Sequence, residues 1–435
     1  MNTIIFHTQY RVVLQITGIV LLLVILCSQS AVSQTKFIKY DLNPVLIAGP
    51  TGSWDENVDG IYGCSVIYHN SKYHMWYGGY KGNVGAIGYA YSDDGTSWTK
   101  YSGNPVFTPG AAGDFDAGIG GCFVLFNSGK FHMYYNGTNT GTTRIGYAYS
   151  VDGIQWTKHP TYVFEKGAVG AWDEKNIAIG SVIKEDSVLK MFYTGKSTTS
   201  SWFTGFATSP DSIHWTRPDS GNPVLGGGVM GAWDQYSQNS GTVLKNGSLF
   251  EMWYDNQQQA PYCIGYAHST DGGLNWITHK DNPIIKGDAG TWDAGFTIYP
   301  MVVKRPDGRY LLYYTGVNGE WTTQSIGLAI EDTTLTKTGN YKFENPSSFV
   351  LAQNYPNPFN PTTTIEYQVP KQSLIALKVF DLLGREIATL VNEEKETGRY
   401  SVQFSMSKYQ VSSGVYFYCL QAGQHSAVRK MLLVR

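Results

Sequence analysis

The sequence predicts an all-β protein, a five-bladed β-propeller at residues 36–343 followed by a small β-sandwich, and three observations support this fold. One pattern of about 60 residues occurs five times, and a period of that length is typical of arrays whose units pack on their neighbours. Four of the repeats hold four short runs of β-branched and aromatic residues and the fifth holds three, separated by Gly, Asn and Asp turns. After a linker at 344–350, short alternating runs and a Pro-rich entry at 351–435 favour a sandwich.

The first 33 residues predict an export signal. An apolar run follows Arg11, and the small residues Ala31 and Ser33 precede the expected cleavage point. The run is short for a full bilayer span, so an uncleaved anchor is the weaker alternative. We therefore expect residues 1–33 to be removed during secretion.

Each repeat opens with an aromatic residue followed by Asp, and four of the five close with an Asp-containing turn and a Trp. We expect the turn Asp to cap local backbone amides. One four-stranded sheet alone would expose apolar faces, so five sheets packed radially are the expected arrangement. The opening pairs are Trp54-Asp55, Phe115-Asp116, Trp172-Asp173, Trp233-Asp234 and Trp292-Asp293.

The fifth repeat lacks its closing strand, and the start of the mature chain offers a replacement. Residues Phe37 to Tyr40 match the closing strand of the first repeat, with Phe37 in the place of Trp98. We expect them to complete the fifth blade and close the ring, which removes two exposed sheet edges. Residues 341–343 are a competing candidate.

Composition argues against several classes of function. Charged residues make up 15% of the chain and the net charge is -2, which gives no electrostatic case for nucleic acid. The sequence holds no zinc-type cluster, EF-hand loop, phosphate-binding Gly loop or GxSxG motif. Cys64 and Cys122 occupy matching places in the first two repeats, where they could face each other near the axis, and free buried thiols are the favoured state.

The segment from about residue 36 to 343 resembles the five-bladed propellers of the arabinanase, levansucrase and invertase superfamily, close to glycoside hydrolase families 43, 32 and 130. The resemblance rests on the motifs GSWDENVDGIYGCSVIY, YHMWYGG, IGYAYSDDGTSW and GNPV. It implies catalytic carboxylates on the innermost strands of blades one to three, around an axial cleft. This sequence departs from that pattern, because the aligned places hold Gly63-Cys64, Gly121-Cys122 and Ile179-Gly180.

The segment from residue 351 to 435 resembles the sorting domain of the type IX (Por) secretion system. The motifs are LAQNYPNPFNPTTTIEY, LKVFDLLGREIATLV and SGVYFYCLQAG, with a basic ending. The resemblance implies that the type IX machinery is a partner and that the protein reaches the cell surface or the extracellular space.

Hydrolysis of a glycosidic bond needs one protonated and one ionised carboxyl on either side of the anomeric carbon. In this sequence the acids lie in the loops that enter the inner strands. We expect Glu174 to be the general acid, because the superfamily places that acid in blade three, and Asp59 or Asp55 to be the base. Asp116 would tune a neighbour, and Asp173 is a further candidate. Because an Asp recurs in every repeat, a structural role is the alternative for each.

Aromatic residues near the cleft could bind sugar faces. The candidate substrate-binding residues are Trp54, Trp172, Trp233 and Trp292, together with Asp234 and Asp293. Packing within the blades is the alternative role of these Trp. Trp202, Trp321 and Tyr262 lie in variable loops and are further platform candidates. No metal ligand set is visible, although the resemblance allows a structural calcium near the axis.

The sequence therefore predicts a secreted, monomeric, carbohydrate-active enzyme. It would be a glycoside hydrolase or phosphorylase acting on plant or microbial oligosaccharide or polysaccharide. A non-catalytic carbohydrate-binding propeller and, less favoured, a scaffold for protein partners are the alternatives. Two carboxyls facing each other at about 5–10 Å would favour the enzyme.

Overall fold

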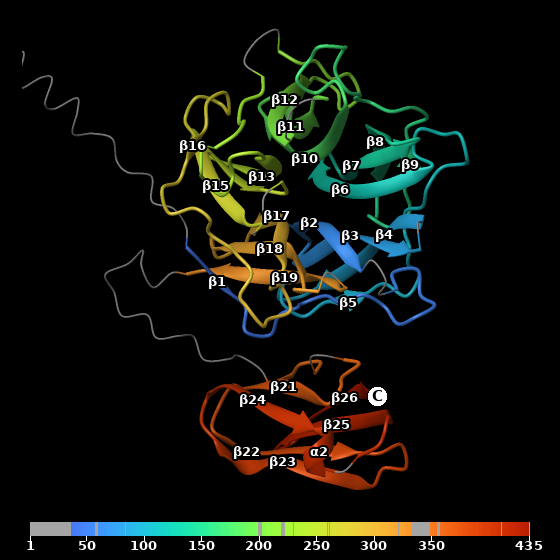
Figure 1. Cartoon of the computed structure of the whole chain (residues 1–435), viewed down its shortest axis with the longest axis vertical. Helices are drawn as coiled ribbons and strands as arrows, with labels where there is room; N and C mark the ends of the chain where they lie inside the picture. The colour runs from blue at the N-terminus through green and yellow to red at the C-terminus, as the bar shows by residue number, and fades with distance from the viewer. Residues whose placement is uncertain are drawn as a thin grey trace, which may run out of the picture.

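The computed structural model forms two units, a larger ring of sheets and a smaller C-terminal unit (Figure 1). The predicted signal and the competing closing segment at 341–343 lie outside the described residues. None of the helices described is long and apolar enough to cross a membrane. The structure describes residues 36–56, 60–82, 84–198, 202–218, 222–228, 230–258, 260, 262–320, 322–332, 349–354, 357–409 and 411–434.

Five antiparallel sheets surround one axis, as predicted (Figure 1). Within each sheet the chain runs outward from an inner strand that faces the axis. Blade one holds β2 (Ile61–His69), β3 (Lys72–Lys81), β4 (Val84–Ser92) and β5 (Thr99–Lys100), and blade two holds β6 (Gly118–Asn127), β7 (Lys130–Asn139), β8 (Thr142–Ser150) and β9 (Thr157–Lys158). Blade three holds β10 (Asn176–Glu185), β11 (Val188–Lys196) and β12 (Trp202–Ser209), and blade four holds β13 (Asn239–Asn246), β14 (Leu249–Asp255), β15 (Ile264–Ser269) and β16 (Ile277–Thr278).

Blade five contains strands from both ends of the propeller. Its strands are β17 (Phe296–Lys304), β18 (Tyr310–Val317), β19 (Gln324–Glu331) and β1 (Phe37–Lys39). β1 pairs antiparallel with β19, with Phe37 opposite Glu331. The predicted closure by the start of the mature chain is therefore confirmed, and it covers the β19 edge.

Blade three departs from the predicted four strands, because its fourth segment makes only a bridge between Thr208 and Thr216. In blade one the residue after the fourth strand, Tyr101, donates its amide to Tyr89 O at 2.9 Å. Pro218 holds that place in blade three, and proline has no amide hydrogen to donate. The ladder therefore ends one bond earlier.

The turns that close the blades join neighbouring sheets. Asp94 Oδ1 accepts the amides of Thr96 and Ser97 at 2.7 and 2.8 Å, which confirms the predicted capping role. The turn of the next blade also receives a side chain from the preceding one, since Trp76 Nε1 donates to Gly153 O at 2.8 Å. Each turn thus holds its own strand end and one neighbour.

The same contact is missing where blade four meets blade five. Trp253 occupies the place of Trp76, and in the sequence of blade five Thr333 stands where blade one has the capping Asp94. Phe37 of β1 instead meets the Trp253 ring edge-on at 6.4 Å. The buried Trp253 Nε1 has no hydrogen-bond partner among the described residues.

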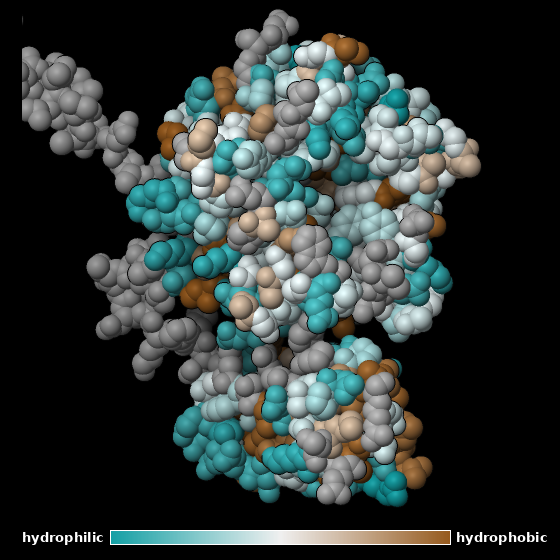
Figure 2. All heavy atoms as spheres, in the orientation of Figure 1, coloured by the Kyte–Doolittle hydropathy of each residue, from teal (hydrophilic) through white to brown (hydrophobic). Residues whose placement is uncertain are grey.

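The C-terminal unit is the predicted β-sandwich. Ile365, Leu377 and Tyr418 lie fully buried in a core of its own, while Figure 2 shows apolar residues on its visible surface. One sheet orders β20 (Val350–Leu351), β21 (Thr362–Val369) and β24 (Gly398–Ser405), and the other orders β23 (Glu386–Lys395), β22 (Ser373–Phe380), β25 (Gly414–Ala422) and β26 (His425–Leu433), with the short α2 (Met406–Tyr409) after β24.

Replacing Trp76 and Trp253 separately by Phe tests the inter-blade hydrogen bond. Both rings are fully buried and both changes remove the same atoms, but only Trp76 has a partner for its N–H. We expect Trp76→Phe to lower the free energy of unfolding by about 1–2 kcal/mol more than Trp253→Phe. Urea unfolding of the two variants measures the difference, and equal costs would contradict the proposed role of the turn.

Candidate active site

Every inner strand changes register at the same level, near its N-terminal end. A β-bulge inserts unpaired residues into one strand, and bulges concentrate next to functional sites. Because all five bulges face the axis, they bring five stretches of backbone together there. The shifts lie between Tyr62 and Cys64, Ile119 and Cys122, Ile179 and Ser181, Ser240 and Thr242, and Ile298 and Met301.

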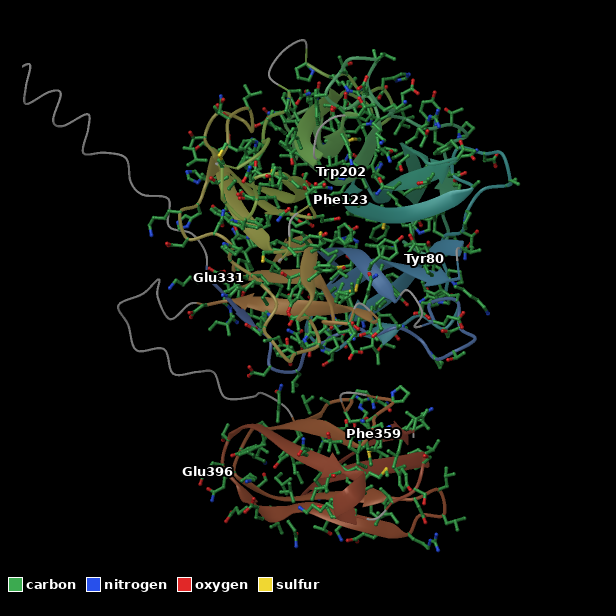
Figure 3. The ribbon with its side chains drawn as sticks, in the orientation of Figure 1. Tyr80, Phe123, Trp202, Glu331, Phe359 and Glu396 are labelled. Atoms are coloured by element: carbon green, nitrogen blue, oxygen red, sulfur yellow. The ribbon has the colours of Figure 1, made fainter. Side chains whose placement is uncertain are left out.

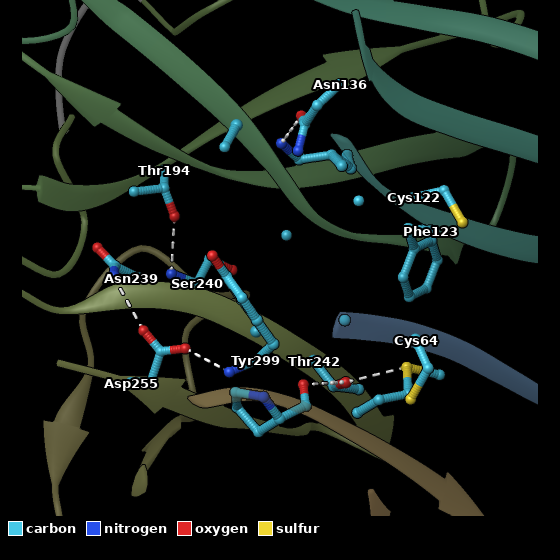
Figure 4. A pocket seen from close by; sticks show the side chains of 18 of the residues that line it. Cys64, Cys122, Phe123, Asn136, Thr194, Asn239, Ser240, Thr242, Asp255 and Tyr299 are labelled. Atoms are coloured by element: carbon cyan, nitrogen blue, oxygen red, sulfur yellow. Dashed lines mark hydrogen bonds between the residues drawn. The ribbon is translucent and has the colours of Figure 1, made fainter. Parts of the chain in front are cut away.

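The five bulges line an axial pocket of about 200 Å³ (Figure 4). This is smaller than the roughly 300–1,000 Å³ of sites for drug-sized ligands. Four bulges contribute glycine, and Gly63 has a φ of 48°, a conformation that glycine adopts without strain. The fifth contributes Tyr299 and Pro300, so blade five narrows the pocket.

Asp255, at the end of β14, is the one carboxylate among the described residues that line the pocket. Its Oδ1 accepts from Asn239 Nδ2 at 2.9 Å and its Oδ2 accepts from the Tyr299 amide at 2.6 Å. Gln257 Nε2 donates to both oxygens. Burial raises the pKa of Asp255 to about 6, against the lowering effect of these hydrogen bonds. A buried carboxyl with this pKa can hold a proton in mildly acidic solution.

Amides, hydroxyls and aromatic rings make up much of the remaining lining. Thr194 Oγ1 accepts the Ser240 amide at 3.0 Å, and Asn136 Oδ1 accepts the Ile179 amide at 2.8 Å. Trp202, a predicted platform candidate, lines the pocket, and Figure 3 shows it near the centre of the propeller. The pocket therefore presents neutral polar groups and one aromatic wall beside Asp255.

A second aromatic group lies where blades one and five meet. Tyr62 stacks on Tyr80 with ring centroids 4.9 Å apart, and Tyr299 lies 6.3 Å from Tyr62. Tyr299 stays 41% exposed. Its φ of 54° is rare for a residue with a side chain, and the bond from its amide to Asp255 helps to hold this conformation.

Both predicted axial thiols line the pocket as free cysteines. Burial raises the pKa of Cys122 to about 12. Burial, with a smaller contribution from Cys122, also raises the pKa of Cys64 well above its ordinary value. The two thiols are protonated at neutral pH and act as apolar lining.

The structure places the recurring Asp residues inside their blades rather than in the pocket. Each one is buried and accepts a hydrogen bond from a Tyr of the second strand in its own blade. The pairs are Asp55 with Tyr77 at 3.3 Å, Asp116 with Tyr135 at 3.0 Å, Asp173 with Tyr193 at 2.9 Å, Asp234 with Tyr254 at 2.7 Å, and Asp293 with Tyr314 at 2.9 Å.

A cation or an amide completes each pair. The cation comes from the blade's closing strand, two residues after its aromatic residue, except in blade four, where Thr278 occupies that place and Gln238 donates to Asp234 instead. A buried carboxyl group that is held by a tyrosine and by a cation or an amide anchors its loop. Asp55, Asp116 and Asp173 were predicted as catalytic, and Asp234 and Asp293 as substrate-binding. The contacts of all five are those expected of the structural alternative. The cations are Lys100, Lys158, Arg217 and Lys39.

Glu174 lies in a loop, and its own side chain bridges two parts of that loop. Its carboxylate accepts the Gly170 amide at 2.6 Å and the Thr198 hydroxyl at 2.9 Å. The Gly170 amide, followed by Thr198, lowers the pKa of Glu174, which is the wrong direction for a proton donor. Gln235 makes the same bond to Gly231 in blade four, so this contact needs no acid.

The predicted Trp platforms pack within their own blades. The Trp54 ring lies 5.6 Å from Tyr77, and a Cβ at Gly79 or Gly88 would approach the Trp54 ring within 2.7 Å. Trp172, Trp233 and Trp292 make the same contacts, with Tyr193, Tyr254 and Tyr314. These rings fill a space that the glycines leave, which is the alternative role considered for them.

Of the remaining predicted residues, one is described by the structure and two are not. Tyr262 stacks on Phe296 at 4.1 Å, away from the lining. Asp59 and Trp321 lie outside the described residues. Within the described ranges, no group of three or more His, Cys, Asp or Glu could hold a metal ion, so these ranges do not locate the calcium that the resemblance allowed.

Two family models match parts of the chain. The Glycosyl hydrolases family 32 N-terminal domain matches residues 122–235, and the Secretion system C-terminal sorting domain matches residues 353–434. Two uncharacterized proteins of Mycobacterium tuberculosis are 25% identical over 224 and 228 residues, covering 48% of this chain and 71% of each relative.

Solved structures share the propeller. A candidate glycoside hydrolase from Parabacteroides distasonis has a TM-score of 0.58 at 18% identity over 71% of this chain and 99% of its own. A second structure comes from a study of family GH130, which reports glycoside hydrolases that target β-1,2 mannosidic linkages. Its TM-score is 0.55 at 19% identity, and the match covers 72% of this chain and 98% of that chain. A thermostable family-43 glycoside hydrolase has a TM-score of 0.52 at 18% identity, and the match covers 70% of this chain and 98% of that chain. At these identities the likeness shows the fold.

The chain thus folds as a five-bladed propeller that solved glycoside hydrolases share, and residues 122–235 match the Glycosyl hydrolases family 32 N-terminal domain. The chain also carries a secretion-system C-terminal sorting domain. This domain indicates type IX secretion to the cell surface or the extracellular space.

Replacing Asp255 by Asn tests its environment through stability. The folded pKa of about 6 exceeds the roughly 3.9 of an unfolded Asp, so the wild-type protein loses stability as pH rises between these values. Between pH 4 and pH 7 the free energy of unfolding of the wild-type protein should fall by about 2–3 kcal/mol more than that of Asp255→Asn. Urea unfolding across this range measures the difference. Asp271→Asn is the control, because hydrogen bonds from Asn275 lower the pKa of that exposed Asp. Parallel curves of stability against pH for Asp255→Asn and the wild-type protein would contradict a raised pKa of the buried Asp255.

Proposed function

We propose that the protein is a secreted glycoside hydrolase whose axial pocket holds one sugar ring of a plant or microbial oligosaccharide. The observation that carries the proposal is Asp255, a buried carboxyl of raised pKa in a pocket otherwise lined by neutral groups. Titratable groups with perturbed pKa values in clefts are candidates for catalysis. The shared fold and the sorting domain agree with a secreted carbohydrate-active enzyme.

In this proposal Asp255 is the general acid. A general acid works best when its pKa lies near the working pH, and a pKa of about 6 keeps a useful fraction protonated in mildly acidic solution. Asn239, Gln257 and the Tyr299 amide fix both carboxyl oxygens. Trp202 offers a face for the sugar ring.

The second carboxyl of the proposed reaction is Asp59. It precedes Gly60, directly before the inner strand β2, whose residues Tyr62 to Cys64 line the pocket. It therefore remains the candidate for the base that activates water. The anchored Asp55 is the weaker choice, because Tyr77 and Lys100 already occupy its Oδ2.

A carbohydrate-binding propeller without catalysis is the second candidate. It is favoured by the presence of one carboxylate among the described lining residues, where hydrolysis needs two. In that case Asp255 would hold the strained Tyr299 backbone and accept hydroxyl groups of a bound sugar. Measuring turnover separates the two candidates.

The test compares three variants of the secreted protein on a panel of plant, fungal and bacterial oligosaccharides. Asp255→Asn should lower kcat by at least about 100-fold, since proton transfer from a positioned acid is worth about 10²–10⁴. Asp59→Asn should lower it similarly. Glu174→Gln should retain activity within about threefold, because its contacts close a loop. Wild-type activity should also fall as pH rises above about 6, where Asp255 loses its proton.

Activity lost in Glu174→Gln and kept in Asp255→Asn would overturn this assignment and restore Glu174 as the acid. Saturable binding of glycans without turnover in the wild-type protein would establish the binding propeller instead. Thermal unfolding of each variant separates loss of chemistry from loss of fold.

A further inference from the structure

The four-stranded sheet of the sorting domain is apolar on its outward face as well as on the face that packs in the core. Along β22, β25 and β26 every second residue is buried, as in strands with one buried face. The buried set includes Leu377, Tyr418 and Met431. Polar residues are expected at the alternate, outward positions of such strands. Apolar residues that are half-buried or exposed occupy many of them instead, and together they are called the apolar face: Phe380, Val415, Phe417, Cys419, Val428 and Leu432.

The strand register makes the apolar face continuous. Phe380 of β22 lies opposite Phe417 of β25. Two residues earlier in β25, Val415 lies opposite Leu432 of β26. Side chains that lie opposite each other on one face of a sheet are in contact. In Figure 2 apolar residues gather on the right of this unit and hydrophilic ones on its left, so the apolar surface is concentrated rather than scattered.

The loop that follows Phe380 presents two leucines to solvent. Leu382 and Leu383 lie between β22 and β23 and are 68% and 79% exposed. The Asp381 side chain fixes this loop. Its Oδ1 accepts the amides of Leu383 and Arg385, both at 2.9 Å, and its Oδ2 accepts Arg385 Nε at 2.7 Å. Because a loop held in one conformation loses little entropy on binding, this loop is a preorganised contact for a partner.

The charges beside the loop favour a protein partner over a membrane. Arg385 forms an ion pair with Asp381 at 2.7 Å, and Lys378 forms one with Glu386 at 2.8 Å. Lys430, opposite Phe417, adds one positive charge to the face. Anionic membranes are bound by clusters of about four to eight Lys or Arg, and two of the cations here already have carboxylate partners. A protein with an apolar groove needs no such cluster.

The propeller contacts the other sheet of the sorting domain. Gln368 Nε2, on β21, donates to the Tyr40 hydroxyl of the propeller at 3.2 Å. β21 pairs with β20 and β24, whereas the apolar face belongs to the sheet of β22, β25 and β26. Val428, on the apolar face, is 57% exposed. This face is therefore accessible to a partner other than the propeller.

We propose that the type IX machinery recognises this protein through the apolar face and the loop of Leu382 and Leu383. The partner would be a protein of that machinery with an apolar groove that receives the two leucines. The match of residues 353–434 to the secretion-system sorting domain is the reason for choosing this partner. Concentrated exposed apolar surface is typical of interaction sites. The proposal does not depend on the proposed hydrolysis.

The test measures export of the full-length chain from a bacterium that has a type IX system. One variant carries Leu382→Ser with Leu383→Ser, a second carries Val428→Ser, and Leu374→Ser is the control. Leu374 is 64% exposed at the other end of β22, opposite Glu394. The leucine-pair variant should lower the secreted fraction at least about tenfold, as expected when an interface loses a central contact. Val428→Ser should lower it at least about threefold, and Leu374→Ser less than about twofold.

The melting temperature of each purified full-length variant separates recognition from folding. All of the changed side chains are exposed, so each variant should melt within about 3 °C of the wild-type protein. Secretion of both the leucine-pair variant and Val428→Ser at the wild-type level would overturn the proposal. An equal loss of secretion in Leu374→Ser would also overturn it, because the effect would then not belong to this surface.

Two measurements on the purified full-length protein test the other occupants of the apolar face. Sedimentation gives the oligomeric state, and co-sedimentation with vesicles of phosphatidylethanolamine and phosphatidylglycerol gives membrane binding. We expect no self-association and no vesicle binding that depends on the leucine pair. A wild-type dimer that dissociates in the leucine-pair variant would assign the surface to a second copy of the chain. Vesicle binding that this variant loses would assign it to a membrane, and either result would overturn the proposal.

Discussion

One buried contact, repeated in all five blades, fixes both the ring and the pocket. In each blade an Asp of the entering loop accepts a hydrogen bond from a Tyr near the end of the second strand. Successive side chains of a strand point to opposite faces, so the residue after that Tyr is aimed away from the Asp. In blades two, three and four this next residue is Asn136, Thr194 and Asp255, and all three line the pocket. The anchor therefore positions the candidate chemistry one residue away.

Much of the fold could be predicted from the sequence because the repeat is strict. The period and the four runs in each repeat predicted five sheets, and the likeness of Phe37 to Trp98 predicted the closing strand. The loss of the fourth strand in blade three depends on one missing donor, at Pro218. Among the described residues the N–H of Trp253 has no partner, and Phe37 of β1 lies against its ring. This arrangement becomes visible only once neighbouring blades are in contact.

The candidate site was harder to predict, because the recurring loop acids are more conspicuous in the sequence than Asp255. Every repeat has an Asp after a Trp or Phe, and Asp55, Asp116 and Asp173 are those of the first three repeats. All three are buried beside a Tyr and a cation, which gives a structural reason for the repetition. Asp255 carried a signal that was available in the sequence. The residue after the repeated Tyr varies as Gly78, Asn136, Thr194, Asp255 and Thr315, although its neighbours are nearly constant. The bulges that turn this position toward a pocket leave no such signal, because they depend on pairing between strands.

The central claim is that the pocket between the inner-strand bulges, rather than the ring of loop acids, receives the substrate. A crystal structure of Asp255→Asn soaked with xylo-, manno- and arabino-oligosaccharides tests it most directly. The account predicts a sugar ring in the axial pocket, within hydrogen-bond distance of the side chain at position 255 and beside the Trp202 ring. A sugar bound over the loops near Glu174 and Trp172, with the axial pocket free of it, would contradict the account.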